Sequence, residues 1–330
     1  MMSLGAGNET GFKILQGLGF DLSQISKQEI HENFQQIYKL LEQSNNSLDM
    51  IMGNTLFFKK SLKLLDLPSD NLTYYYGLEK VPINVRNWTR GSNQINEYIK
   101  NKTHGGISDL LLKLKYPANL ALVNYIFFTG PWIQGFDPEN TKEQNFIVDD
   151  QTIVKVPMMF QSRIFNFLYD PILQCFVVEL TSMGKNKMLL VLSNREEIGT
   201  VINRLSHETL YRWSQSIITS YLDLYVPKLS LSGICDLGDI MKGMGIADLK
   251  RTKTNLAGLT GSAMRKLSKV LHMTKLEITE QVTEQDVPTD DTLYRNRRPM
   301  ILRFDQPFLL MIFDTDTWNI LFLGKVIYPV

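Results

Sequence analysis

The stretch Leu120–Phe128, LALVNYIFF, is apolar along nearly its whole length and is followed by the turn-forming pair Gly130-Pro131. A short, continuous apolar run that ends at such a pair is typical of a β-strand buried on both faces. The run is far shorter than the roughly 20 apolar residues that a membrane-spanning helix needs. We therefore predict that it forms a central strand of a sheet.

Around this strand, the chain changes from helical patterns in its first third to β patterns in its last third. Residues 26–29, SKQE, form a capping box, and the apolar residues behind it recur at helical spacing. Further strands are expected at residues 48–58, 146–159, 175–180, 187–192, 222–229, 308–313 and 320–327. This order predicts a mixed α+β fold with large antiparallel sheets.

Composition argues against several classes of function. The chain has 330 residues and a formal net charge of +1, so charge favours neither nucleic acid nor a membrane as a partner. Its 2 cysteines, Cys175 and Cys235, are too few for a disulfide framework or a zinc site and are expected to be buried free thiols. The 4 histidines stand apart from one another and from the cysteines, so we expect no metal and no other cofactor. No nucleophile–base set can be assembled, and we predict no enzyme.

Glycosylation sequons of the form N-x-[ST] gather in the first third of the chain. They begin at Asn8, Asn45, Asn71, Asn87 and Asn101. Their clustering favours secretion, although chance accounts for some of them. The first residues, MMSLGAGNET, lack the basic and apolar regions of a signal peptide. Either the protein is not exported or its true N-terminus is missing.

Residues 280–298, EQVTEQDVPTDDTLYRNRR, are acidic in their first half and basic in their second. They join two β-like runs. A polar segment of roughly 20 residues inside a compact domain is either a disordered insert or an exposed functional loop.

A family resemblance is carried by short motifs in a fixed order. They are NYIFFTGPW at 124–132, FDP at 136–138, VKVPMM at 154–159, FDQPF at 304–308 and LFLGKV at 321–326. Together they resemble the serpin superfamily, and within it the secreted antitrypsin-like clade that includes the hormone-binding globulins. The resemblance implies a single domain over residues 1–330. Its α+β serpin fold would have three β-sheets surrounded by about eight to nine helices, with a reactive-centre loop exposed at about 280–299.

The resemblance also bears on the N-terminus. Residues 2–5 resemble the end of the family's second helix. The family's signal peptide, first helix, a buried strand and most of the second helix would then precede Met1. Losing such elements should cost more than the ~5–15 kcal/mol that keeps a domain folded. We expect that the 330 residues do not fold stably alone and reflect an incomplete gene sequence or splice form, in which case they could have no activity at all.

In inhibitory serpins the cleaved reactive-centre loop inserts into the main sheet as a new strand. The first part of the loop, called the hinge and placed here at residues 282–288, needs small side chains and intact backbone donors for this insertion. Val282 is β-branched where the inhibitors have Gly. Thr283 and Gln285 would share one face of the inserted strand, and Gln285 against the buried face of the sheet would need hydrogen-bond partners or leave polar atoms unsatisfied at a cost of ~1–3 kcal/mol. Pro288 removes one hydrogen bond from a central strand. We therefore expect a non-inhibitory serpin; the alternative is a serine-type endopeptidase inhibitor.

The resemblance places the reactive bond near Asn296-Arg297. The neighbouring residues 295–298, RNRR, also resemble a dibasic processing site. Proteases that cleave the exposed loop after Arg295 are therefore expected partners, unless the segment is only an exposed charge run.

The hormone carriers of this clade hold their ligand in a surface cleft, and the resemblance places a ligand-stacking tryptophan at Trp318. A flat indole suits a flat apolar ligand, although a half-buried Trp at a β-turn is the structural alternative. Further cleft positions fall on Glu179, His207, Tyr211 and Thr315, where the steroid carriers have amide, Arg, Asn and His residues. A carboxyl group such as that of Glu179 in an apolar cleft should be protonated or pair with a cation. The resemblance implies a secreted monomer that carries a small apolar hormone such as a glucocorticoid.

If the hinge cannot insert, cleavage of the loop should leave the melting temperature unchanged. Incubation with trypsin-like and chymotrypsin-like proteases should also give no covalent complex on a denaturing gel. A marked rise in heat resistance after cleavage, or a stable complex, would show that the loop does insert.

Overall fold

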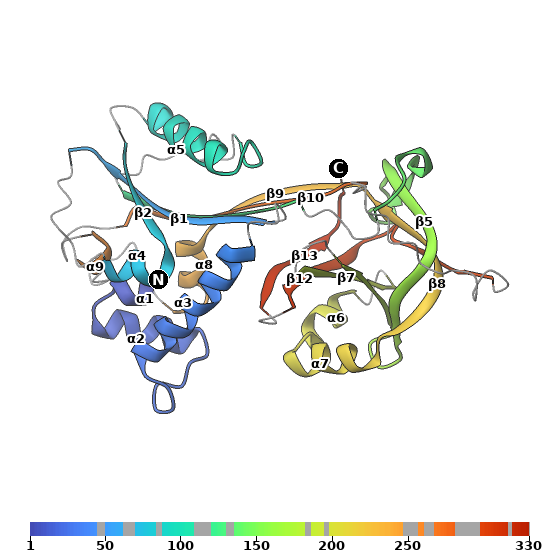
Figure 1. The fold of residues 1–330 in the computed structure, drawn as a ribbon, viewed down its shortest axis with the longest axis horizontal. Coiled ribbons are helices and arrows are strands. Elements are labelled where there is room, and N and C mark those ends of the chain that lie inside the picture. Colours follow the sequence, from blue (N-terminus) through green and yellow to red (C-terminus); the bar gives the residue numbers. More distant parts are fainter. Residues whose placement is uncertain are drawn as a thin grey trace. The chain divides into compact units, whose positions relative to one another are not determined.

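The computed structural model describes the chain except for residues 45–49, 62–69, 84–87, 109–119, 130–134, 182–185, 195–197, 247–256, 261–266, 281–297, 316–318 and 330. The described chain divides into two compact units (Figure 1). The first comprises Met1–Phe128 and Ser232–Lys275, and the second Thr129–Leu231 and Leu276–Val330.

The first unit is built on a 5-stranded sheet whose central strand is β3 (Leu120–Phe128). The strand order is β2 (Leu78–Ile83), β1 (Met50–Lys59), β3, β10 (Lys269–Ile278) and β9 (Leu229–Asp236). β1 runs antiparallel to β3, with Met50 opposite Phe128, and parallel to β2. The sequence prediction of a central strand at this position is confirmed.

Helices cover both faces of this sheet, which explains why β3 is apolar on both sides (Figure 1). The helix α5 (Trp88–Lys102) lies on one face, where Ile95 and Ile99 pack with Val123 and Phe127. On the other face lie α1 (Met2–Gly5), α2 (Asn8–Gly17), α3 (Lys27–Ser44), α4 (Asp70–Tyr76) and α8 (Leu237–Gly243), and the unit also contains α9 (Ala257–Thr260). The predicted capping box is present at the start of α3, where Glu29 N donates to Ser26 Oγ at 3.1 Å.

The second unit contains an 8-stranded sheet. Its order is β11 (Met300–Arg303), β8 (Ile218–Pro227), β5 (Ile153–Asp170), β6 (Cys175–Thr181), β7 (Asn186–Ser193), β12 (Phe308–Asp314) and β13 (Ile320–Val326), while β4 (Lys142–Ile147) also pairs with β5. The long strand β5 pairs with β4, then β8, then β6 along its length. It thereby joins the strands of this unit into one hydrogen-bonded sheet. The unit also contains η3 (Pro138–Asn140), α6 (Ile198–Arg204) and α7 (His207–Ser216).

Two local expectations need correction. The alternating run at 146–159 is a hairpin rather than one strand, because Gln151 N donates to Asp149 Oδ1 at 2.8 Å and turns the chain between β4 and β5. Cys175 is buried, and burial is the main cause that raises its pKa to about 12. The prediction of two buried thiols was wrong for Cys235, which is exposed on β9 at the edge of its sheet.

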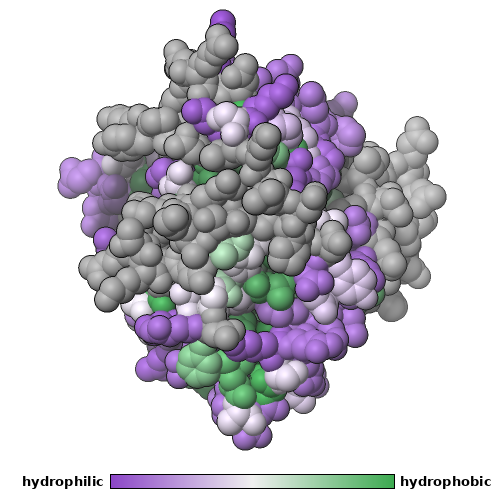
Figure 2. Space-filling model, turned by 90° about the vertical axis from the view of Figure 1, so that its left-hand side faces the viewer, coloured by the Kyte–Doolittle hydropathy of each residue, from purple (hydrophilic) through white to green (hydrophobic). Residues whose placement is uncertain are grey.

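Among the residues that Figure 2 colours by hydropathy, most are hydrophilic, with small hydrophobic groups between them. Exposed apolar residues of the first unit include Phe12, Leu18 and Phe34. A scatter of this kind is ordinary for a folded protein. Within the described part of the chain, no helix combines the length and apolar content that crossing a membrane takes.

The central position of β3 predicts a large cost for truncating it. Leu122 is 1% exposed, so Leu122→Ala should lower the free energy of unfolding by about 2–5 kcal/mol. The matched control is Leu40→Ala in α3, where the side chain is 44% exposed and the change should stay within about 0.5 kcal/mol. Urea denaturation measures both, and equal costs would contradict the central placement of β3.

Candidate functional site

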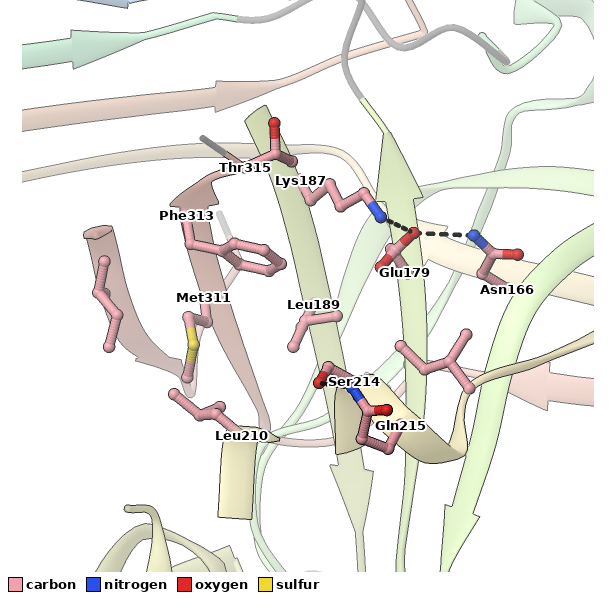
Figure 3. A pocket seen from close by; sticks show the side chains of 12 residues that line it. Asn166, Glu179, Lys187, Leu189, Leu210, Ser214, Gln215, Met311, Phe313 and Thr315 are labelled. Atoms are coloured by element: carbon pink, nitrogen blue, oxygen red, sulfur yellow. Dashed lines mark hydrogen bonds and ion pairs between the residues drawn. The ribbon is translucent and has the colours of Figure 1, made fainter. Parts of the chain in front are cut away.

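A cavity of about 450 Å³ opens on one face of the second unit's sheet (Figure 3). This volume lies within the range of about 300–1,000 Å³ that is typical of small-molecule sites. The described residues that line it are Asn166, Glu179, Lys187, Leu189, Leu210, Ser214, Gln215, Ile217, Met311, Phe313, Thr315 and Ile320.

Strand register builds the base of this cavity. Glu179 on β6 lies opposite Asn166 on β5 and opposite Leu189 on β7. Leu189 in turn lies opposite Met311 on β12. Side chains two residues apart on a strand point to the same face, so Lys187 follows Leu189 into the cavity. The base is therefore apolar along β7 and β12 and polar where β5, β6 and the start of β7 meet.

The helix α7 forms the side of the cavity through Leu210, Ser214 and Gln215 (Figure 3). Its first turn is capped because Thr209 N donates to Ser206 Oγ at 3.2 Å. Its Trp213 is 1% exposed and belongs to an apolar cluster with Leu189, Met311 and Phe313, which also line the cavity. The cavity therefore borders the apolar core of this unit and shares these three side chains with it.

The carboxylate of Asp170, at the end of β5, fixes α7 on the sheet. Trp213 Nε1 and an Arg212 guanidinium nitrogen each donate to Asp170 Oδ2 at 2.7 Å. The backbone N–H groups of Ile172 and Leu173 donate to Oδ1 at 2.8 and 3.2 Å. Burial alone would raise the pKa of Asp170, but the hydrogen bonds from Trp213 and the backbone, with the charge of Arg212, hold it below its usual value of 3.8.

The polar end of the cavity holds an ion pair. Glu179 Oε1 accepts from Asn166 Nδ2 at 2.8 Å and lies 2.9 Å from Lys187 Nζ (Figure 3). The side chain of Glu179 is 5% exposed and that of Lys187 is 33% exposed. Of the two outcomes expected for a carboxyl group in this cleft, the structure has the pairing with a cation.

The sequence-predicted cleft residues are only partly brought together. Glu179 and Thr315 line the cavity. His207 opens α7 and is exposed, Tyr211 is 62% exposed, and neither is among the described lining residues. Trp318 lies outside the described residues, in the short segment between the lining residues Thr315 and Ile320.

Sequence reasoning missed Asn166 and Lys187. A signal for Lys187 was present, because it shares the alternating face of Leu189 and Val191 in a run expected to be a strand. A lone charged residue on an otherwise apolar strand face needs a partner, and that partner is Glu179 on the neighbouring strand.

The predicted reactive-centre residues Val282, Thr283, Gln285, Pro288, Asn296 and Arg297 lie outside the described residues. Just before them, Glu280 Oε2 lies 2.8 Å from Lys228 Nζ. Burial would raise the pKa of Glu280, but the bond from Lys228 and further hydrogen bonds lower it.

The structure describes three of the five predicted glycosylation sites. Asn71 on α4 and Asn101 on α5 are exposed, and Asn8 opens α2. Asn45 and Asn87 lie outside the described residues. In the part of the chain that the structure describes, no cluster of His, Cys, Asp or Glu side chains could hold a metal ion.

Comparison with known proteins defines the class. The sequence profile of the family described as Serpin (serine protease inhibitor) matches residues 1–329, and the chain belongs to this family. The corticosteroid-binding globulin of Bos taurus is 47% identical over 329 residues, which are 100% of this chain and 81% of that protein. Human thyroxine-binding globulin, in complex with thyroxine, matches with a TM-score of 0.89 and 32% identity, covering 100% of this chain and 88% of that one. Mouse protein Z-dependent protease inhibitor matches with a TM-score of 0.85 and 28% identity, covering 100% and 87%.

These relatives confirm the predicted family and fold. A protease-inhibitor family and a binding globulin are not classes of enzyme, in agreement with the prediction of no catalytic activity.

The lowered pKa of Asp170 predicts that the free energy of unfolding falls in acid. Asp170→Asn should lower the free energy of unfolding by about 1–3 kcal/mol at neutral pH, because an amide replaces an acceptor of buried donors. Since the folded-state pKa is depressed below 3.8, the contribution is present above that pH and is lost as the pH falls through the folded value. The difference between wild type and variant in urea denaturation should therefore shrink in acid. The exposed Glu143→Gln serves as a control, and an Asp170→Asn difference independent of pH would contradict the assignment.

Proposed function

We propose that this protein is a secreted, non-inhibitory serpin that binds and transports a small apolar hormone such as a glucocorticoid. The observation that carries the proposal is the cavity of about 450 Å³ in the second unit, with an apolar base and a polar end. The name of the bovine relative, a corticosteroid-binding globulin, supports the ligand class.

The lining suits a flat, mostly apolar molecule. Leu189, Met311 and Phe313 offer one continuous apolar surface on neighbouring strands β7 and β12. Few but well-placed polar groups are typical of small-molecule sites, because they orient a ligand that apolar contact holds. Trp318 is proposed to stack on the ligand, and Thr315, which precedes it in sequence, lines the cavity. His207 and Tyr211 are proposed as further contacts at the rim.

The second candidate is a serine-type endopeptidase inhibitor that acts through the reactive-centre loop. It is favoured by the description of the family and by the likeness to the mouse protease inhibitor. The hinge sequence opposes it, because Val282, Gln285 and Pro288 hinder insertion of a strand.

Secretion follows from the same proposal. The exposed residues Asn71 and Asn101 are proposed as glycosylation sites, together with Asn8, Asn45 and Asn87. The proposed protein acts as a monomeric single serpin domain with its loop at about 280–299. Proteases that cleave this loop after Arg295 are proposed partners.

Fluorescence titration with cortisol or progesterone tests the carrier function. Steroid should quench tryptophan emission in a saturable way, because an indole at Trp318 would contact the bound ligand. The quenching should vanish in Trp318→Ala and persist in the control Trp88→Phe, because Trp88 begins α5 in the first unit whereas the described lining residues belong to the second. A flat signal in the folded wild-type protein would reject the proposal.

A further inference from the structure

We infer that the Glu179–Lys187 ion pair determines the charge of the ligand that this cavity accepts. This inference rests on the proposed carrier function and deepens it. The cavity selects an uncharged amphipathic molecule, with a hydroxyl or carbonyl group at one end, over an otherwise identical ionised one. Lys187 and Glu179 act as specificity-determining residues.

The pair is built into the sheet. Glu179 lies opposite Asn166 on β5 and Leu189 on β7, and its side chain is 5% exposed. Both Asn166 Nδ2, at 2.8 Å, and Lys187 Nζ, at 2.9 Å, contact the same oxygen, Oε1 (Figure 3). A carboxylate buried to this extent requires such partners, because an unpaired buried charge is costly.

Charge balance gives the selectivity. Among the described residues that line the cavity, Glu179 and Lys187 alone are ionisable, so their formal charges cancel. A ligand carboxylate near Lys187 would also lie near the carboxylate of Glu179, and a ligand ammonium would meet Lys187. Either ionised ligand would lose its hydration on binding. It would gain little in return, because each charge in the cavity is already neutralised by the other member of the pair.

An uncharged polar group avoids this conflict. A lysine ammonium carries three donors, so Lys187 can donate to a carbonyl or hydroxyl oxygen while it stays paired with Glu179. A carboxylate has two oxygens and accepts several hydrogen bonds, so Glu179 can accept from a ligand hydroxyl in the same way. The apolar body of the ligand then lies on Leu189, Met311 and Phe313.

A matched pair of probes isolates charge from shape. Cortisol hemisuccinate is an anion, and its methyl ester is uncharged and of nearly the same size. Isothermal titration calorimetry on the full chain should give tighter binding of the ester than of the anion by about tenfold or more in the wild type.

Two single variants should shift this preference in opposite directions. Glu179→Gln leaves Lys187 with an uncompensated positive charge, so affinity for the anion relative to the ester should rise by about 10- to 100-fold. Lys187→Gln leaves the carboxylate and should strengthen discrimination against the anion. The double variant Glu179→Gln with Lys187→Gln should lose the gain seen in Glu179→Gln alone.

Thermal melts confirm that each variant is folded, and either single variant suffices if the other does not fold. If the ligands bind but the ester-to-anion ratio is the same in wild type and variants, the inference is overturned while the carrier function stands. If neither probe nor cortisol binds the folded wild-type protein, both are overturned.

Discussion

One buried carboxylate holds the helix beside the cavity in place. Asp170 accepts from the Trp213 indole, from Arg212 and from two backbone N–H groups, so its charge is compensated although its residue is 2% exposed. The indole that donates to it also packs against the strands beneath α7. Leu210 and Ser214, which line the cavity, lie on the same helix, so the hydrogen bonds to Asp170 act with the apolar packing of α7 to position them above the sheet.

The sheet beneath α7 changes character along its length. Beneath Trp213 the sheet carries a row of buried apolar side chains, formed by Val177, Val191 and Leu309 on neighbouring strands. The next row contains Glu179 and Leu189, and beyond it Lys187 lies opposite Phe313. Register in the dry part of the sheet is set by burial, since a slip of one residue would turn the apolar side chains outward. The same register places Glu179 between Asn166 and Leu189, and so brings the Glu179 carboxylate within reach of Lys187 at the polar end of the cavity.

Patterns within one element could be predicted from the sequence, whereas pairings between elements could not. The apolar run Leu120–Phe128 identified the central strand because burial on both faces leaves a direct trace in composition. The strand face of Lys187 indicates that this residue needs a partner, but it does not identify Glu179, because the two belong to different strands and meet only through register. Cys235 was misjudged for a similar reason: its exposure follows from the edge position of β9, which is a property of the sheet order. Trp318 and the hinge at 282–288 came from family resemblance and stay predictions.

Backbone likeness cannot separate a carrier from an inhibitor here, since TM-scores of 0.89 and 0.85 relate the chain to one of each. The two functions make different demands on the same fold. An inhibitor needs a loop that can enter a sheet as a strand, which requires small side chains and a full set of backbone donors, and Val282 and Pro288 oppose both requirements. A carrier needs only a cavity whose surroundings stay fixed. Among the described residues, Asp170 and the strand register supply these surroundings, so the two functions place their demands on different parts of the chain.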